Sequence, residues 1–174
     1  MTDAGHLPVV VRPESAADHD AIRSLVARAF AGHPFSDGSE PRIVDELRRA
    51  GALASSLVAV MGGHVVGHVA FSALEGAAQH GWYALGPISV EPAYQRRGVG
   101  AELIETGLRD LRFRGARGCA LVGDHHYYRR FGFLVVPDLA PSEYPAEHFQ
   151  VLAFGSSRLQ VPVAFHPAFS IGSP

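Results

Sequence analysis

A strand, a glycine-containing turn, a helix and a second strand follow one another between residues 84 and 122. Residues 84–90 form a β-type run, and residues 98–114 carry apolar side chains at helical spacing from Val99 to Leu111. Residues 119–122 are an unbroken apolar run, which is typical of a buried strand. Because a helix between two strands carries the chain back to the same end of a sheet, this unit predicts a parallel strand pair.

The other patterns predict antiparallel pairing around that unit. Residues 55–74 contain two β-type runs around Gly62-Gly63, which is a strong hairpin signal. The remaining expected elements are a strand at 7–12, helices at 14–30 and from Pro41 to just before Gly51, a short helix at 124–131, and β-type runs at 133–136, 148–154 and 159–165. The order predicts one α/β (α+β) domain over residues 1–174, with helices flanking a mixed, mostly antiparallel sheet.

Composition narrows the functional class. The 174 residues carry a formal charge of −2, so bulk charge gives no reason to expect a nucleic-acid partner. The mean hydropathy is +0.09, and no apolar run approaches the roughly 20 residues of a membrane-spanning helix. We see no secretory signal at the start, and the single Cys119 excludes an internal disulfide framework. These features predict a cytoplasmic protein that does not bind a membrane.

The turn at residues 95–100, Gln-Arg-Arg-Gly-Val-Gly, has the composition of an anion site. A helix N-terminus offers unpaired N–H groups and partial positive charge, and glycines allow a phosphate close to those groups. A bare tight turn with two solvated arginines is the alternative. Two other phosphate loops fit poorly, because a Walker A loop needs Gly-Lys-Ser/Thr after the turn, and the dinucleotide fingerprint needs a third glycine where Leu103 stands.

Residues 95–100 match the Q/R-x-x-G-x-G/A signature, and in this respect the chain resembles the GNAT superfamily of acyl-CoA-dependent N-acyltransferases. A second block, "GDHHYYRRFGF" at 123–133, is similar to that family's Tyr-x-x-x-Gly-Phe element. The stretches at 65–72 and 163–169 resemble the YhbS-like branch. The resemblance implies a GNAT-like fold with a splayed parallel strand pair, and an N-acetyltransferase that uses acetyl-CoA.

The resemblance also implies where the cofactor lies. The pyrophosphate is expected on the amides of the glycine turn, and the pantetheine arm is expected to pair like an extra strand with residues 88–90. The expected cofactor-binding residues are Ile88, Ser89, Val90, Gln95, Arg96, Arg97, Gly98, Val99, Gly100, Ala101 and Asp124. Asp124 is also a natural N-cap for the short helix. Direct acyl transfer requires no metal, so none is expected.

Tyr128 matches the family's general-acid position. A phenol with an ordinary pKa of about 10 stays protonated at neutral pH and can protonate the departing thiolate. The alternative is a core tyrosine in an aromatic cluster, which is how we interpret Tyr127. Cys119 is expected to be buried and inert, which favours transfer without an acyl-enzyme.

The general base is left open by the sequence. Family members often carry a glutamate near the start of the fourth strand, but the stretch "YALGPIS" contains no acid. The candidates are Glu75, His68, His80, His125 and His126, and a water relay is a further alternative.

The acceptor is expected to be a primary amine, by resemblance alone. The loop at 33–41 and the region at 137–149 would select it, with His33, Phe35, Asp37, Glu143, Tyr144 and Glu147 as aromatic and acidic candidates. The alternative function is a non-catalytic acyl-CoA-binding sensor or an interaction module. A homodimer is also left open.

Overall fold

The computed structural model describes residues 8–76 and 81–172. The helices are α1 (His19–Phe30), α2 (Glu40–Arg49), α3 (Val99–Phe113) and α4 (His125–Tyr128). The strands are β1 (Val10–Pro13), β2 (Leu53–Met61), β3 (His64–Ala73), β4 (Trp82–Val90), β5 (Gly118–Val122), β6 (Leu134–Val135) and β7 (Phe149–Ala153). Residue 7, where the first predicted strand was to begin, lies outside the described residues.

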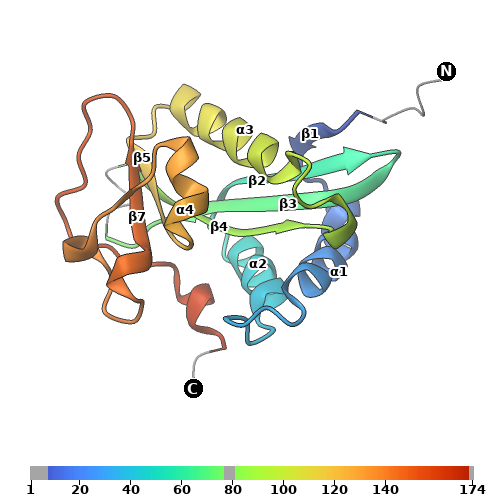
Figure 1. Ribbon diagram of the computed structural model, residues 1–174, viewed down its shortest axis with the longest axis horizontal. Helices are drawn as coiled ribbons and strands as arrows, with labels where there is room; N and C mark the ends of the chain where they lie inside the picture. The colour runs from blue at the N-terminus through green and yellow to red at the C-terminus, as the bar shows by residue number, and fades with distance from the viewer. Residues whose placement is uncertain (1–7, 77–80, 173–174) are drawn as a thin grey trace.

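One sheet runs through the described part of the chain, in the strand order β1-β2-β3-β4-β5-β7-β6. Strands β4 and β5 are parallel, and every other neighbouring pair is antiparallel. Helix α3 covers one face of the sheet, and α1 and α2 cover the other (Figure 1). The predicted mixed sheet with flanking helices and one parallel pair is confirmed.

Helix α3 packs close to the sheet at two glycines. Its apolar stripe, which includes Leu103, Ile104 and Leu108, is buried against β2 and β3. A Cβ atom at Gly107 would overlap the ring of Phe71, and one at Gly67 would lie 2.9 Å from Cδ1 of Leu103. Glycine at these two positions therefore allows the helix and the strand to approach each other more closely than side chains would permit.

The opposite face has a separate core. Ile22 and Val26 of α1 pack with Val44 of α2 and Val58 of β2. A short 3-10 turn near the C-terminus, Pro167–Ser170, packs against α2, where Ala168 is buried with Ile43 and Leu47. Figure 1 shows this terminal segment next to α2.

Two predicted elements differ in the structure. The predicted strand at 159–165 does not form, and only an isolated bridge joins Glu75 to Ala164. Pro162, in the middle of that run, has no N–H group to donate to a ladder. The predicted helix at 14–30 begins with a 3-10 turn at Ala16–Asp18, where the Asp18 carboxylate accepts the N–H of Ser15 at 2.7 Å, and α1 starts only at His19. In the described part of the chain, no helix combines the length and apolarity needed to cross a membrane.

The close approach at Gly107 gives a direct test of the packing. Gly107→Ala should destabilise the protein by about 1–3 kcal/mol, because the added methyl overlaps Phe71. Helix propensity alone predicts the opposite sign, a gain of about 0.8–1 kcal/mol. Urea unfolding decides between the two, and Glu105→Ala on the exposed face of α3 is the matched control. A more stable Gly107→Ala protein would contradict the tight contact.

Candidate functional site

The parallel strands β4 and β5 separate after three residue pairs. Their pairing ends at Ala84 opposite Ala120. Beyond that point β4 stays with β3 as far as Val90, whereas β5 stays with β7 as far as Val122. The facing edges of the two strands are therefore not paired with each other over residues 85–90. Main-chain groups on such an edge can pair with an extended ligand.

A bulge in β4 accompanies this separation. Val69 and Phe71 of β3 pair with Ile88 and Leu85, so two residues of β4, Gly86 and Pro87, lie opposite one residue of β3. A bulge bends its strand and increases the local twist, and proline cannot donate to a ladder. The bulge therefore redirects β4 away from β5.

The glycine turn lies at the end of β4 and begins α3. Gly98 is the N-cap residue, with φ of +86°, and a Cβ atom there would meet nothing within 4 Å. Arg96 also has a positive φ, +59°, which is uncommon for a residue other than glycine. The start of α3 thus has open space at Gly98, beside the exposed side chains of Arg96 and Arg97. This geometry suits an anion.

Two contacts hold the turn against β4. The side-chain amide of Gln95 donates to the carbonyl oxygen of Val90 at 3.1 Å. A Cβ atom at Gly100 would lie 3.6 Å from Cγ2 of Val90 and 3.1 Å from the hydroxyl oxygen of Tyr127. Tyr127 is predicted from the sequence only as a core residue, but its hydroxyl lies beside the turn. The only sequence signal for this was its position next to Tyr128.

Tyr128 lies at the end of α4, the short helix that follows β5. Asp124 caps this helix, because its carboxylate accepts the N–H of His126 at 2.9 Å. The Tyr128 ring packs edge-on against Phe133 and Tyr127, and it covers Gly123. Burial raises the pKa of Tyr128, and Tyr127 and Asp124 raise it further. The phenol therefore stays protonated and is able to donate.

The base candidates lie in very different places. Glu75, His125 and His126 are exposed, and His80 lies outside the described residues. His68 is fully buried on β3. Its Nε2 atom lies 2.8 Å from Oγ of Ser56 and 3.6 Å from Oε2 of Glu14.

Glu14 joins this cluster from the segment after β1. Its carboxylate accepts two hydrogen bonds from Arg48, at 2.8 and 3.0 Å, and one from Ser56 at 2.5 Å. Burial by itself would raise the pKa of Glu14, but the interactions with His68, Arg48 and Ser56 outweigh it and hold that pKa well below its ordinary value. The carboxylate is therefore charged at neutral pH.

The single cysteine and one surface cluster complete the chemistry-bearing groups. Cys119 is buried in β5, and burial raises the pKa of its thiol, so the reactive thiolate is disfavoured. One potential metal-ligand atom from each of the exposed residues Asp124, His125 and His126 lies within 4.8 Å of the other two. The expectation that no metal is needed stays a prediction.

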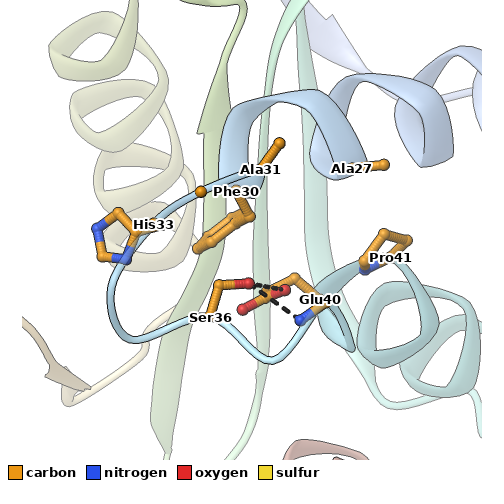
Figure 2. A pocket seen from close by; sticks show the side chains of 9 residues that line it. Ala27, Phe30, Ala31, His33, Ser36, Glu40 and Pro41 are labelled. Atoms are coloured by element: carbon orange, nitrogen blue, oxygen red, sulfur yellow. Dashed lines mark hydrogen bonds between the residues drawn. The ribbon is translucent and has the colours of Figure 1, made fainter.

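A pocket of about 300 Å³ opens between the end of α1 and the start of α2. Figure 2 shows Phe30 and His33 on one side of it and Ser36 with Glu40 on the other. The Ser36 hydroxyl donates to the Glu40 carboxylate at 2.8 Å. Glu40 was absent from the predicted acceptor residues, because it reads as an ordinary first-turn helix residue.

The predicted acceptor residues are divided between two regions. His33 lines the pocket, while Phe35 and Asp37 of the same loop are exposed and do not line it. Glu143 and Glu147 are exposed on the segment before β7, and the Tyr144 ring packs against Phe165. An ion pair at 2.8 Å between Arg28 of α1 and Glu91, just after β4, fixes the end of α1 next to the end of β4.

Comparison with known proteins agrees with this geometry. The family model described as "Acetyltransferase (GNAT) family" matches residues 19–133. A GNAT family acetyltransferase from Brucella melitensis, solved in complex with acetyl-CoA, is 47% identical with a TM-score of 0.84, and the match covers 94% of this chain and 99% of that one.

Two Escherichia coli proteins are also similar. The GNAT family N-acetyltransferase YhbS, solved with CoA, is 30% identical with a TM-score of 0.81, over 98% of this chain and 96% of its own. The uncharacterized N-acetyltransferase YjhQ is 33% identical over 138 residues, which cover 76% of this chain and 72% of YjhQ.

The charged state of Glu14 makes stability depend on pH. Its pKa is lower in the folded than in the unfolded protein, so its contribution is fully present above the ordinary pKa of 4.5 and is lost as the pH falls below it. Glu14→Gln should cost about 1–3 kcal/mol at pH 7, because Arg48 loses its buried partner. The difference from wild type should shrink on acidification. Urea unfolding of both proteins across that pH range measures it, and a constant difference would show that Glu14 does not titrate as described.

Proposed function

The chain belongs to the GNAT acetyltransferase family and is an acyl-CoA-dependent N-acetyltransferase, and on this premise we propose that it transfers the acetyl group of acetyl-CoA directly to a primary amine. The observation that carries the proposal is the gap between β4 and β5, with a glycine turn between β4 and α3 and with a protonated tyrosine on the short helix after β5. The acetyl-CoA complex of the 47% identical Brucella protein supports the same choice of acyl donor.

In this proposal the cofactor spans the turn and the bulged strand. The pyrophosphate binds the N–H groups of Val99, Gly100 and Ala101, with charge from Arg96 and Arg97. The pantetheine arm pairs with the free edge of β4 at residues 88–90, where side-chain identity matters little because the bonds are made by the backbone. Gln95 supports the site indirectly, since its amide is bonded to the carbonyl of Val90.

The chemistry then has two proton steps and one acyl step. The amine must lose a proton before its nitrogen attacks the thioester carbonyl. The C–N bond forms, the C–S bond breaks, and Tyr128 donates its proton to the departing thiolate. No acyl-enzyme is formed, because Cys119 is buried in a strand and its raised pKa disfavours the thiolate.

The amine is proposed to enter through the pocket between α1 and α2. Glu40 supplies negative charge at this pocket, and Phe30 and His33 supply ring faces and edges. A cationic amine with an apolar substituent suits such a lining. Release of free thiol from acetyl-CoA across a panel of primary amines tests the activity and separates an enzyme from a sensor, which would bind the cofactor without releasing thiol.

The turn can be tested with two substitutions that differ only in charge. Asn and Asp both tolerate the left-handed conformation of Gly98. Gly98→Asp should lose more than about tenfold of its acetyl-CoA affinity relative to Gly98→Asn, equivalent to about 1.4 kcal/mol, because the carboxylate repels the pyrophosphate. Calorimetric titration measures both, and the difference should diminish at high salt. Equal affinities would place the phosphates elsewhere.

Tyr128→Phe tests the acid. The variant should keep its acetyl-CoA affinity and lose about 10²–10⁴-fold in kcat, the usual contribution of general acid–base catalysis. Tyr127→Phe is the matched control, since it removes the neighbouring hydroxyl, and its kcat should stay near that of wild type. Single-turnover kinetics confirm that chemistry is the step observed. An unchanged chemical rate in Tyr128→Phe would return this residue to the aromatic core.

A further inference from the structure

His68 lies on the face of the sheet that α1 and α2 cover. Successive residues of a strand point to opposite faces, and the preceding residue, Gly67, faces Leu103 and Val99 of α3. The His68 side chain is 0% exposed. Its Nδ1 atom is buried without a hydrogen-bond partner among the described residues. Leaving a buried polar atom unpaired costs about 1–3 kcal/mol, so this atom calls for an explanation.

The cluster on the other side of the ring determines where its proton sits. A serine hydroxyl has one hydrogen, and Ser56 gives it to Glu14 at 2.5 Å. The Ser56 oxygen must therefore accept from Nε2–H of His68, at 2.8 Å. The neutral ring carries its proton on Nε2, and the lone pair on Nδ1 is left available.

A second unpartnered atom lies across the strand pair from His68. Ser89 of β4 is the direct cross-strand partner of His68, and its Oγ atom is likewise buried without a partner in the described residues. Side chains that face each other in this way have Cβ atoms about 4.5–5.5 Å apart. One small polar molecule can therefore reach both atoms. Ser89 also lies between the two residues, Ile88 and Val90, along which the pantetheine arm is proposed to run.

We propose that His68 is the proton acceptor for the amine, acting through a water molecule held between its Nδ1 atom and the Oγ atom of Ser89. This inference rests on the proposed function. It supplies the base that the acid-free stretch of β4 lacks, and it uses a residue from β3 instead.

The proton balance is complete. The ammonium group gives one proton to the bridging water, which passes a proton to Nδ1 and so forms an imidazolium. The neutral amine forms the C–N bond as the C–S bond breaks, and Tyr128 protonates the departing thiolate. The nitrogen then gives its second proton to the Tyr128 oxygen, which restores the phenol. The imidazolium releases its Nδ1 proton to solvent after the products leave, so one proton is released per turnover.

The charges around His68 suit this role. Burial lowers the pKa of His68, Glu14 opposes that effect, and Arg48 of α2 adds to it, so the ring is neutral and able to accept at pH 7. Once the ring is protonated, the Glu14 carboxylate at 3.6 Å stabilises it. His19 of α1 also faces Glu14, at 3.5 Å, and Asp45 of α2 accepts a hydrogen bond from Arg48 at 2.9 Å.

His68→Gln is the decisive variant, because its amide can still donate to Ser56 while the titratable Nδ1 is removed. The probes are benzylamine, which is protonated at neutral pH, and aniline, which is already neutral. With acetyl-CoA saturating, kcat for benzylamine should fall by about 10²–10⁴-fold, and kcat for aniline by less than about tenfold. The acid limb of the wild-type pH profile for benzylamine, below the ordinary histidine range, should be absent from the variant.

Two controls separate catalysis from folding. Ser72, on the same face of β3, also has a buried Oγ atom without a partner in the described residues. Ser72→Ala should therefore change neither the ratio of kcat for benzylamine to kcat for aniline nor the pH profile for benzylamine. Ser89→Ala, which keeps the backbone, should lower kcat for benzylamine more than for aniline. Equal losses for both amines in His68→Gln would overturn the proposal and leave His68 with a structural role.

Nitrogen NMR of the wild-type ring gives a result that is independent of turnover. The neutral imidazole should carry its proton on Nε2, and a proton on Nδ1 would overturn the assignment whether or not either amine reacts. Acetyl-CoA binding is measured in parallel. If the wild-type protein does not bind acetyl-CoA, the proposed function is wrong. The NMR result then still shows whether the proton of His68 lies on Nε2 or on Nδ1.

Discussion

The short pairing between β4 and β5 is the constraint on which the rest of the site depends. Trp82 and Gly118 begin this pair, and a Cβ atom at Gly118 would overlap the Trp82 ring, so the two strands are packed tightly where they start. After three pairs β4 leaves β5; the bulge at Gly86-Pro87 bends β4, which pairs with β3 again from Ile88 to Val90. Without this divergence the backbone N–H and C=O groups on this edge of β4 would be hydrogen-bonded to β5, and no extended ligand could pair with them.

The two faces of the sheet differ in the side chains that they bury. The face under α3 is apolar at Val69 and Phe71, which share one buried core with Leu103 of α3, and it supports the helix whose N-terminus we propose as the anion site. The face under α1 and α2 contains the buried polar groups His68, Ser72 and Ser89. Cofactor binding and proton handling are thus assigned to opposite sides of one strand pair. A low-dielectric surrounding makes each polar contact on the second face stronger, and each missing one more costly.

Local patterns predicted the order of the elements, the parallel pair and the glycine turn, because each is encoded within a short stretch. The predicted strand at 159–165, which does not form, shows the limit of such patterns, since Pro162 interrupts a run that contains two valines and a phenylalanine. The bulge at Gly86-Pro87 was missed because the choice between bulge and turn depends on the neighbouring strand. The contact of His68 with Glu14 joins residues 54 positions apart, and the position of Glu40 at a pocket depends on how α1 ends. No local periodicity carries such information.

The two glycines at the contact between α3 and β3, Gly107 and Gly67, have a consequence for the geometry of the site. A helix rises about 1.5 Å per residue, so a slip of α3 by one position would bring a side chain onto the Phe71 ring in place of Gly107. The helix therefore has one allowed position along its axis. That position sets the height of its N-terminus above β4, and with it the length of ligand that can lie between the turn and Tyr128. The distances within the proposed site therefore depend on Gly67 and Gly107, two residues that have no side chain.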